Sequence, residues 1–162
     1  MKTKNLALGA LLVALSLILG YVESLFPLSF AVPGIKMGLA NVVVLFALYK
    51  LTPKHAAVIS FVRVCLSSLL FGNVMSFVYS LSGAALSFAV MLLLKKSGKF
   101  TCGGVSAAGG VAHNVGQIAA AMCLLETSRI VWYLPALCVS GVVTGLCIGA
   151  VAALVLSRFK SA

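Results

Sequence analysis

Residues 31–49, AVPGIKMGLANVVVLFALY, decide how the rest of the chain is interpreted. The stretch contains Pro33 and Gly34, a pair that the interior of a helix would not accommodate. A cation, a glycine and an amide follow, and an apolar segment begins after them. Polar groups at such a place are costly in a membrane unless they face protein, water or a ligand. We interpret the stretch as one wall of a solute pocket at the outer face of a membrane. An ordinary loop with a snorkelling lysine is the alternative.

The composition of the chain places this stretch in a membrane protein. The 162 residues are 62% hydrophobic and 9% charged, which is more apolar surface than a soluble domain of this size can bury. Because a membrane-spanning helix needs about 20 mostly apolar residues, the length accommodates about six spans with short links. We expect an all-α integral membrane protein with six transmembrane helices, in which residues 1–162 form a single transmembrane domain.

The apolar segments predict where these helices lie. The first has two lysines before an apolar run, as a signal peptide does, but it is long for one and more spans follow it. We therefore interpret it as the first span. The expected spans are residues 5–22, 35–51, 56–71, 74–94, 105–125 and 131–156.

The positive charges predict the topology. The net charge is +10, but the cations lie mainly at the ends of spans, so they indicate membrane sidedness and contact with lipid headgroups rather than nucleic-acid binding. If six spans alternate in direction, Lys36 and Arg129 fall on one side, beside both carboxylates. The other side receives Lys2, Lys4, Lys50, Lys54, Lys95, Lys96, Lys99, Arg158 and Lys160. This asymmetry predicts a multi-pass protein of the cell membrane with both termini in the cytoplasm.

The scarcity of acidic residues excludes several kinds of chemistry. The chain has no aspartate, and its only carboxylates are Glu23 and Glu126. It cannot by itself assemble a carboxylate-bound magnesium cluster or a paired-carboxylate acid–base site. Its five cysteines form no CxxC pair and are interpreted as small core residues, and its two histidines make a metal site unexpected. We expect no enzymatic activity and no cofactor.

Polar residues within the spans predict a cavity. Arg63 lies nine residues after Lys54, about 13 Å deep at ~1.5 Å per residue, near the middle of a membrane core of about 30 Å. A mid-membrane arginine is a functional candidate, although one bonded to backbone carbonyls would be structural. Most of the polar positions fall in the outer half, which predicts a cavity open outward and closed inward. The predicted substrate-binding residues are Lys36, Asn41, Arg63, Asn73, Tyr79, His113, Asn114 and Gln117.

The charges expected around this cavity favour an anionic solute. Lys36 and Arg63, with Arg129 as a candidate third cation, would face the two carboxylates. This slight excess favours a carboxylate- or phosphate-bearing molecule. Aromatic rings that could stack on such a molecule are those of Phe77, Tyr79 and Trp132.

Small residues predict two closely packed helix faces. In the last span, Gly141, Gly145 and Gly149 recur every four residues. In the first span, Ala7, Ala10 and Ala14 fall on one face, where another helix could approach closely. That helix could belong to this chain or to a partner subunit, and the alanines are our predicted partner-docking residues.

Three motifs together resemble a known family. They are PGIKMGLAN at residues 33–41, Arg63 followed by LLFG at 69–72, and AHNVGQ at 112–117. The chain resembles the Gx transporter family, also labelled heptaprenyl diphosphate synthase component I, over nearly its whole length. More distantly, the short spans and the alanine spacing look like the S components of energy-coupling factor (ECF) vitamin transporters. That resemblance implies an ECF S-component-like bundle, a coupling transmembrane subunit docked at Ala10 and Ala14, and two ATPase subunits that drive toppling.

The two family labels predict different functions. Prenyl chain elongation uses Mg²⁺ held by aspartates, which this chain lacks, and the absence of a P-loop assigns any ATP hydrolysis to partners. We favour the S component of an ECF-type importer that captures a vitamin-like, anionic, flavin-like small molecule from outside. The alternative is a membrane accessory subunit of prenyl diphosphate or quinone synthesis. A self-contained transporter or a structural membrane protein is the third possibility.

Overall fold

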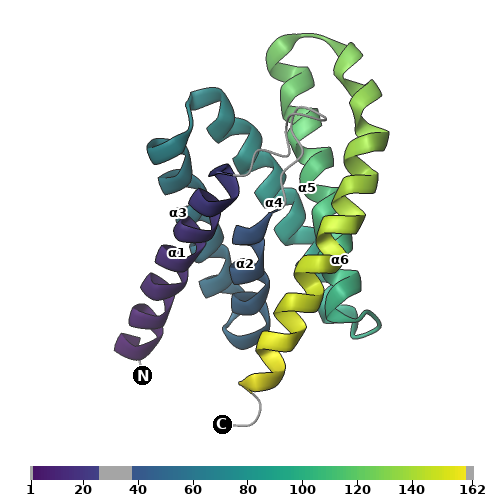
Figure 1. Ribbon diagram of the computed structural model, residues 1–162. Coiled ribbons are helices and arrows are strands. Elements are labelled where there is room, and N and C mark those ends of the chain that lie inside the picture. The colour runs from purple at the N-terminus through teal and green to yellow at the C-terminus, as the bar shows by residue number, and fades with distance from the viewer. Residues whose placement is uncertain (1, 26–37, 160–162) are drawn as a thin grey trace.

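The fold is an all-α bundle, as predicted (Figure 1). The computed structural model describes residues 2–25 and 38–159, and the helices below are those of that part of the chain. Five regions are long and apolar enough to cross a membrane, which confirms the membrane class: α1, α3, α4, α5 and η2 with α6. The elements are α1 (Lys2–Leu25), α2 (Leu39–Lys50), α3 (Pro53–Phe71), α4 (Val74–Ser97), α5 (Cys102–Leu125), the 3₁₀ helix η2 (Ser128–Tyr133) and α6 (Leu134–Arg158).

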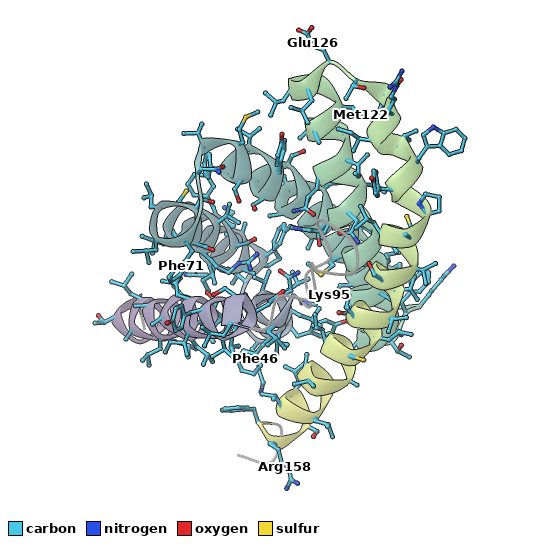
Figure 2. All side chains as sticks on the ribbon, turned by 45° about the horizontal axis from the view of Figure 1, so that its top comes forward. Phe46, Phe71, Lys95, Met122, Glu126 and Arg158 are labelled. Atoms are coloured by element: carbon cyan, nitrogen blue, oxygen red, sulfur yellow. The ribbon has the colours of Figure 1, made fainter. Side chains whose placement is uncertain are left out.

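Consecutive helices run in alternate directions, so the start of α1 and the end of α6 lie at the same end of the bundle (Figure 1). We call this the terminal end and the opposite one the far end. Arg158 lies at the terminal end and Glu126 at the far end (Figure 2). For the cations of the described residues, the predicted grouping therefore fits the helix directions, whereas the placement of the termini in the cytoplasm stays a prediction.

Local sequence signals account for several helix starts. Thr52, Asn73 and Thr101 each accept a hydrogen bond from the backbone N–H three residues later, which is the usual side-chain cap of a helix N-terminus. Pro53 then occupies the first turn of α3, where its missing N–H is tolerated. The cap and the proline explain why α3 begins three residues before the predicted Ala56.

Glycines bring α5 and α6 into backbone contact, which confirms the predicted glycine face. A Cβ atom on Gly145 would lie 2.6 Å from the Cα atom of Ala107, and one on Gly149 would lie 2.6 Å from the Cα atom of Gly103. Only glycine permits this approach, because backbone atoms cannot move aside as a flexible side chain can. Close packing of this kind holds helices together where water supplies no hydrophobic drive.

The apolar core lies toward the terminal end and is centred on α2. Residues 43–48 of α2 are all buried, and Leu45 and Leu48 are each at most 1% exposed. The cluster continues through Ile59 of α3, Met91 of α4 and Val105 of α5. Many large apolar side chains elsewhere are exposed, as expected for a surface in lipid.

Candidate functional site

A cavity of about 370 Å³ lies between the helices, on the far side of the apolar core. It reaches Ser24 of α1 and Gly72 at the end of α3, and it ends inward at Leu45, Met91 and Ile148, which belong to the core. Hydroxyl groups supply much of its polar lining. They belong to Ser16, Ser24, Ser67, Ser68, Ser76, Ser80, Ser87, Ser106 and Thr144.

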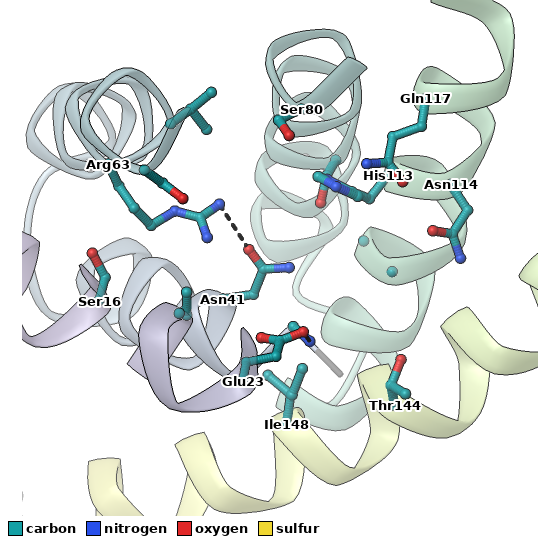
Figure 3. A pocket seen from close by; sticks show the side chains of 18 of the residues that line it. Ser16, Glu23, Asn41, Arg63, Ser80, His113, Asn114, Gln117, Thr144 and Ile148 are labelled. Carbon is teal, nitrogen blue, oxygen red and sulfur yellow. Dashed lines mark hydrogen bonds between the residues drawn. The ribbon is translucent and has the colours of Figure 1, made fainter. Parts of the chain in front are cut away.

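Arg63 contributes a charged group to the cavity from the middle of α3. Its Nη2 atom donates a hydrogen bond to Oδ1 of Asn41 on α2, at 3.2 Å (Figure 3). Its Nε atom is buried and has no hydrogen-bond partner among the described residues. A buried donor without a partner costs about 1–3 kcal/mol of stability, and more when the group is charged. The guanidinium group therefore retains capacity to bind a further acceptor.

Glu23 contributes the only described carboxylate of the cavity lining. Its Oε1 atom accepts the backbone N–H of Gly38 at 2.7 Å, and its Oε2 atom accepts that of Leu39 at 2.9 Å. A carboxylate is favourable there because the first N–H groups of a helix lack partners and carry partial positive charge. Our prediction that the first span ends at Val22 was wrong, because α1 continues to Leu25. Glu23 was expected near the cavity, and the structure places it in the lining, although it was not among the predicted substrate-binding residues.

Three of the predicted substrate-binding residues form a polar stripe on α5 that also lines the cavity. His113, Asn114 and Gln117 all border it. The Nδ2 atom of Asn114 donates to the backbone carbonyl of Leu137 on α6 at 2.6 Å, so this amide also ties α5 to α6. A Cβ atom on Gly83 would lie 2.8 Å from the carbonyl oxygen of His113, so α4 packs closely behind the stripe.

Two predicted site residues lie outside this cavity. Asn73 is exposed, and its side chain caps α4 by accepting the N–H of Ser76 at 2.8 Å. Tyr79 lines a second hollow of about 320 Å³, and Gln117 borders both spaces. Lys36 lies outside the described residues.

Among the described residues, the aromatic and additional charged residues that we expected around the solute do not line the cavity. Trp132 is 83% exposed, and neither it nor Phe77 lines the cavity, so stacking by the predicted aromatic residues is wrong for this space. Arg129 and Glu126 are exposed and lie apart from the cavity as well. Of the charged residues that the structure describes, Arg63 and Glu23 alone line it.

The alanine face of α1 is uncovered. Ala7, Ala10 and Ala14 are all exposed, whereas Leu12 and Ser16 of the same helix are buried in the bundle. The described helices of this chain thus leave the alanines uncovered, which disfavours packing within the chain. Docking of a partner stays a prediction.

The cavity has the chemistry of a small-molecule pocket. Its volume is at the lower end of the usual range of about 300–1,000 Å³. Within residues 2–25 and 38–159, no three His, Cys, Asp or Glu side chains gather as metal ligands would. The lining offers one guanidinium group, one carboxylate, one imidazole, three amide side chains and many hydroxyl groups, a set suited to hydrogen bonding of a polar solute.

The comparisons with known proteins identify a family. Searches of curated proteins and of solved structures found no match to the chain. The family model described as heptaprenyl diphosphate synthase component I matches residues 12–155, a range that includes Asn41, Arg63 and the polar stripe of α5. Because this match spans most of the sequence, the chain belongs to the heptaprenyl diphosphate synthase component I family.

Proposed function

We propose that this chain is a non-enzymatic membrane subunit that captures a small anionic molecule in the cavity, as the S component of an ECF-type importer. The observation that carries the proposal is the guanidinium group of Arg63, which lines a polar cavity and whose buried Nε atom has no described partner. Ionisable groups within a membrane are costly and generally serve function.

The lining indicates the class of solute. A guanidinium group binds carboxylate or phosphate oxygens through parallel hydrogen bonds. Hydroxyl and amide groups can both donate and accept, which suits a heterocycle or a polyhydroxyl chain. We therefore propose a vitamin-like molecule with a single anionic group, and flavin-like molecules are the favoured class.

The closed inner end of the cavity bears on how such a solute would be transported. In the described part of the chain, Leu45, Met91 and Ile148 lie between the cavity and the terminal end, so we expect no open path for the solute through this side of the bundle. Release into the cell would need partners that move or open the bundle. We propose a coupling transmembrane subunit and two ATPase subunits, with the exposed Ala7, Ala10 and Ala14 face of α1 as the docking surface.

A second function is favoured by the family match. The description of the family, heptaprenyl diphosphate synthase component I, points to prenyl diphosphate synthesis rather than to import. In that case the chain would be a membrane accessory subunit, and Arg63 would hold the diphosphate group of a prenyl compound. The chain contains no aspartate, so a partner would supply the Mg²⁺ site that ionises an allylic diphosphate.

Native mass spectrometry of the gently purified full chain tests the binding function. The wild-type protein should retain a small anionic molecule, and Arg63→Ala should lose it. Arg129→Ala is the matched control, because that arginine is exposed and lies outside the cavity. A wild-type protein that retains no molecule, even when purified from rich medium, would contradict the proposal.

Co-purification separates the two functions. A coupling protein with ATPases supports the importer, and a soluble prenyl synthase supports the accessory subunit. Recovery of neither partner after cross-linking in the membrane argues against both.

A further inference from the structure

The helix α2 is a half-helix that begins at the cavity. Its 12 residues span about 18 Å at ~1.5 Å per residue, against about 30 Å for a membrane core. The Nζ atom of Lys50, the last residue of α2, donates a hydrogen bond to the carbonyl oxygen of Phe159 at the terminal end. The N-terminus of this short helix therefore lies within the bundle. There Gly38, Ala40 and Asn41 line the cavity. Half-helices whose positive N-termini face anionic substrates are a recurring device of transporters.

Two positive groups and one negative group therefore meet at this place. The positive groups are the N-terminus of α2 and the guanidinium group of Arg63, which are linked through Asn41. The negative group is the carboxylate of Glu23, which bonds the N-terminus of α2 and forms no ion pair with Arg63 in the structure. The Nε atom of Arg63 is buried and lacks a described partner, so one N–H donor of the guanidinium group is not used by the described residues.

We propose that the anionic group of the solute binds between Arg63 and the N-terminus of α2, and that it competes there with the carboxylate of Glu23. This inference rests on the proposed function, because the cavity is the same. The Glu23 bonds are the only side-chain hydrogen bonds between α1 and α2 in the described part of the chain. Binding of the solute would consequently release the end of α1 from α2 and link occupancy of the cavity to the position of α1.

Removal of the charge of Glu23 tests the competition. Glu23→Gln keeps the size of the side chain but can no longer offer two carboxylate oxygens to the two N–H groups. Glu126→Gln is the matched control, because Glu126 is the only other carboxylate of the chain and is exposed at the far end. The probe is pyrophosphate, titrated calorimetrically into the full chain in detergent, with inorganic phosphate as a weaker anion.

If the carboxylate of Glu23 competes with the anion, replacement of Glu23 should increase the affinity of the protein for pyrophosphate. Glu23→Gln should lower the Kd for pyrophosphate at least tenfold, and Glu126→Gln should change it less than twofold. Addition of Arg63→Ala should abolish the gain. A residue that merely supported the fold would weaken binding when changed. Glu23→Ala carries the same expectation and serves as a second variant if Glu23→Gln does not fold.

The outcomes separate this inference from the proposed function. If Glu23→Gln binds pyrophosphate no better than the wild type, competition is overturned, whereas a molecule retained by the wild type and lost in Arg63→Ala still supports solute binding. If pyrophosphate binds none of these proteins, competition is likewise overturned. The proposed function is then decided by native mass spectrometry, which does not depend on this probe.

Discussion

The Nη2 atom of Arg63 donates to the amide oxygen of Asn41 at 3.2 Å, and this is the only hydrogen bond that the guanidinium group makes with described residues. A neutral amide accepts a hydrogen bond without cancelling charge. No described backbone carbonyl accepts from Arg63, which disfavours the purely structural arginine considered from the sequence. The pair of residues holds a positive charge in place, and the effects expected of substitutions at Arg63 and Asn41 depend on this.

Replacement of Arg63 with alanine should separate binding from stability. We expect at least a tenfold loss of affinity for the retained solute, because the charged anchor is removed. The melting temperature should be unchanged or higher, because a buried and incompletely bonded charge no longer has to be accommodated. Solute occupancy and melting in detergent measure the two effects. A large loss of stability would indicate that Arg63 serves mainly the fold.

Two substitutions of Asn41 should differ in their effect on solute binding: one should abolish it and the other should preserve it. Asn41→Asp would place a carboxylate against Arg63, neutralise it and abolish binding of an anion in a protein that remains folded. Asn41→Ala would remove the acceptor and cost about 1–3 kcal/mol of stability, but it would leave the charge free and preserve binding. The comparison is made by native mass spectrometry of the two variants side by side. Equal binding by both would disprove a role for charge.

The contact between α5 and α6 should not tolerate a methyl group. Gly145→Ala would bring a Cβ atom to 2.6 Å from the backbone of Ala107 and force the helices apart, at a cost of about 1–3 kcal/mol. Gly9→Ala is the control, because nothing lies within 4 Å of that position. Thermal unfolding in a mild detergent should show a lower midpoint for the first variant alone.

Lys95 should stabilise the end of α2 through its ammonium group. Its Nζ atom donates to the carbonyl oxygen of Leu48 at 2.5 Å and lies 5.1 Å from the ring centroid of Tyr49. Leu48 belongs to the last turn of α2, whose carbonyls lack helical partners. Lys95→Met should therefore destabilise the protein by about 1–2 kcal/mol. The exposed neighbour Lys96 is the control, and Lys96→Met should remain within about 0.5 kcal/mol.

The orientation in the membrane can be tested with reporters. Green fluorescent protein attached after residue 162 should fluoresce, because that end is predicted to be cytoplasmic, where the protein folds. In a cysteine-free background, Glu126→Cys should react with an impermeant maleimide added to intact cells, and Lys99→Cys should react only after lysis. The reverse pattern would overturn the predicted topology.

Most of the fold could be predicted because it follows from the composition of segments. Apolar runs gave the spans, and α4 begins at Val74 as predicted, where Asn73 supplies a cap. The end of α1 could not be placed in the same way. The charged Glu23 suggested that the helix ends before it. In the structure Glu23 belongs to α1, and its carboxylate is stabilised by the backbone N–H of Gly38, which lies fifteen residues further along the chain.

The candidate site was predictable only where polar residues interrupt apolar helices. Arg63 and the stripe on α5 stand out for that reason, and both line the cavity. Tyr79 and Asn73 also stand out, but the direction in which each points is set by how α4 rotates against its neighbours. No serine was among the predicted substrate-binding residues, because serine is common in membrane helices and only packing shows which hydroxyl groups face a shared space.

The apolar floor beneath the cavity has a consequence for the cell. Leu45, Met91 and Ile148 belong to a buried cluster that extends to the terminal end and includes Leu48, Ala56 and Ala152. A dry barrier of this kind stops protons and salt ions as well as larger molecules. If the chain is the proposed subunit, a membrane that held it alone should therefore keep its electrochemical gradient.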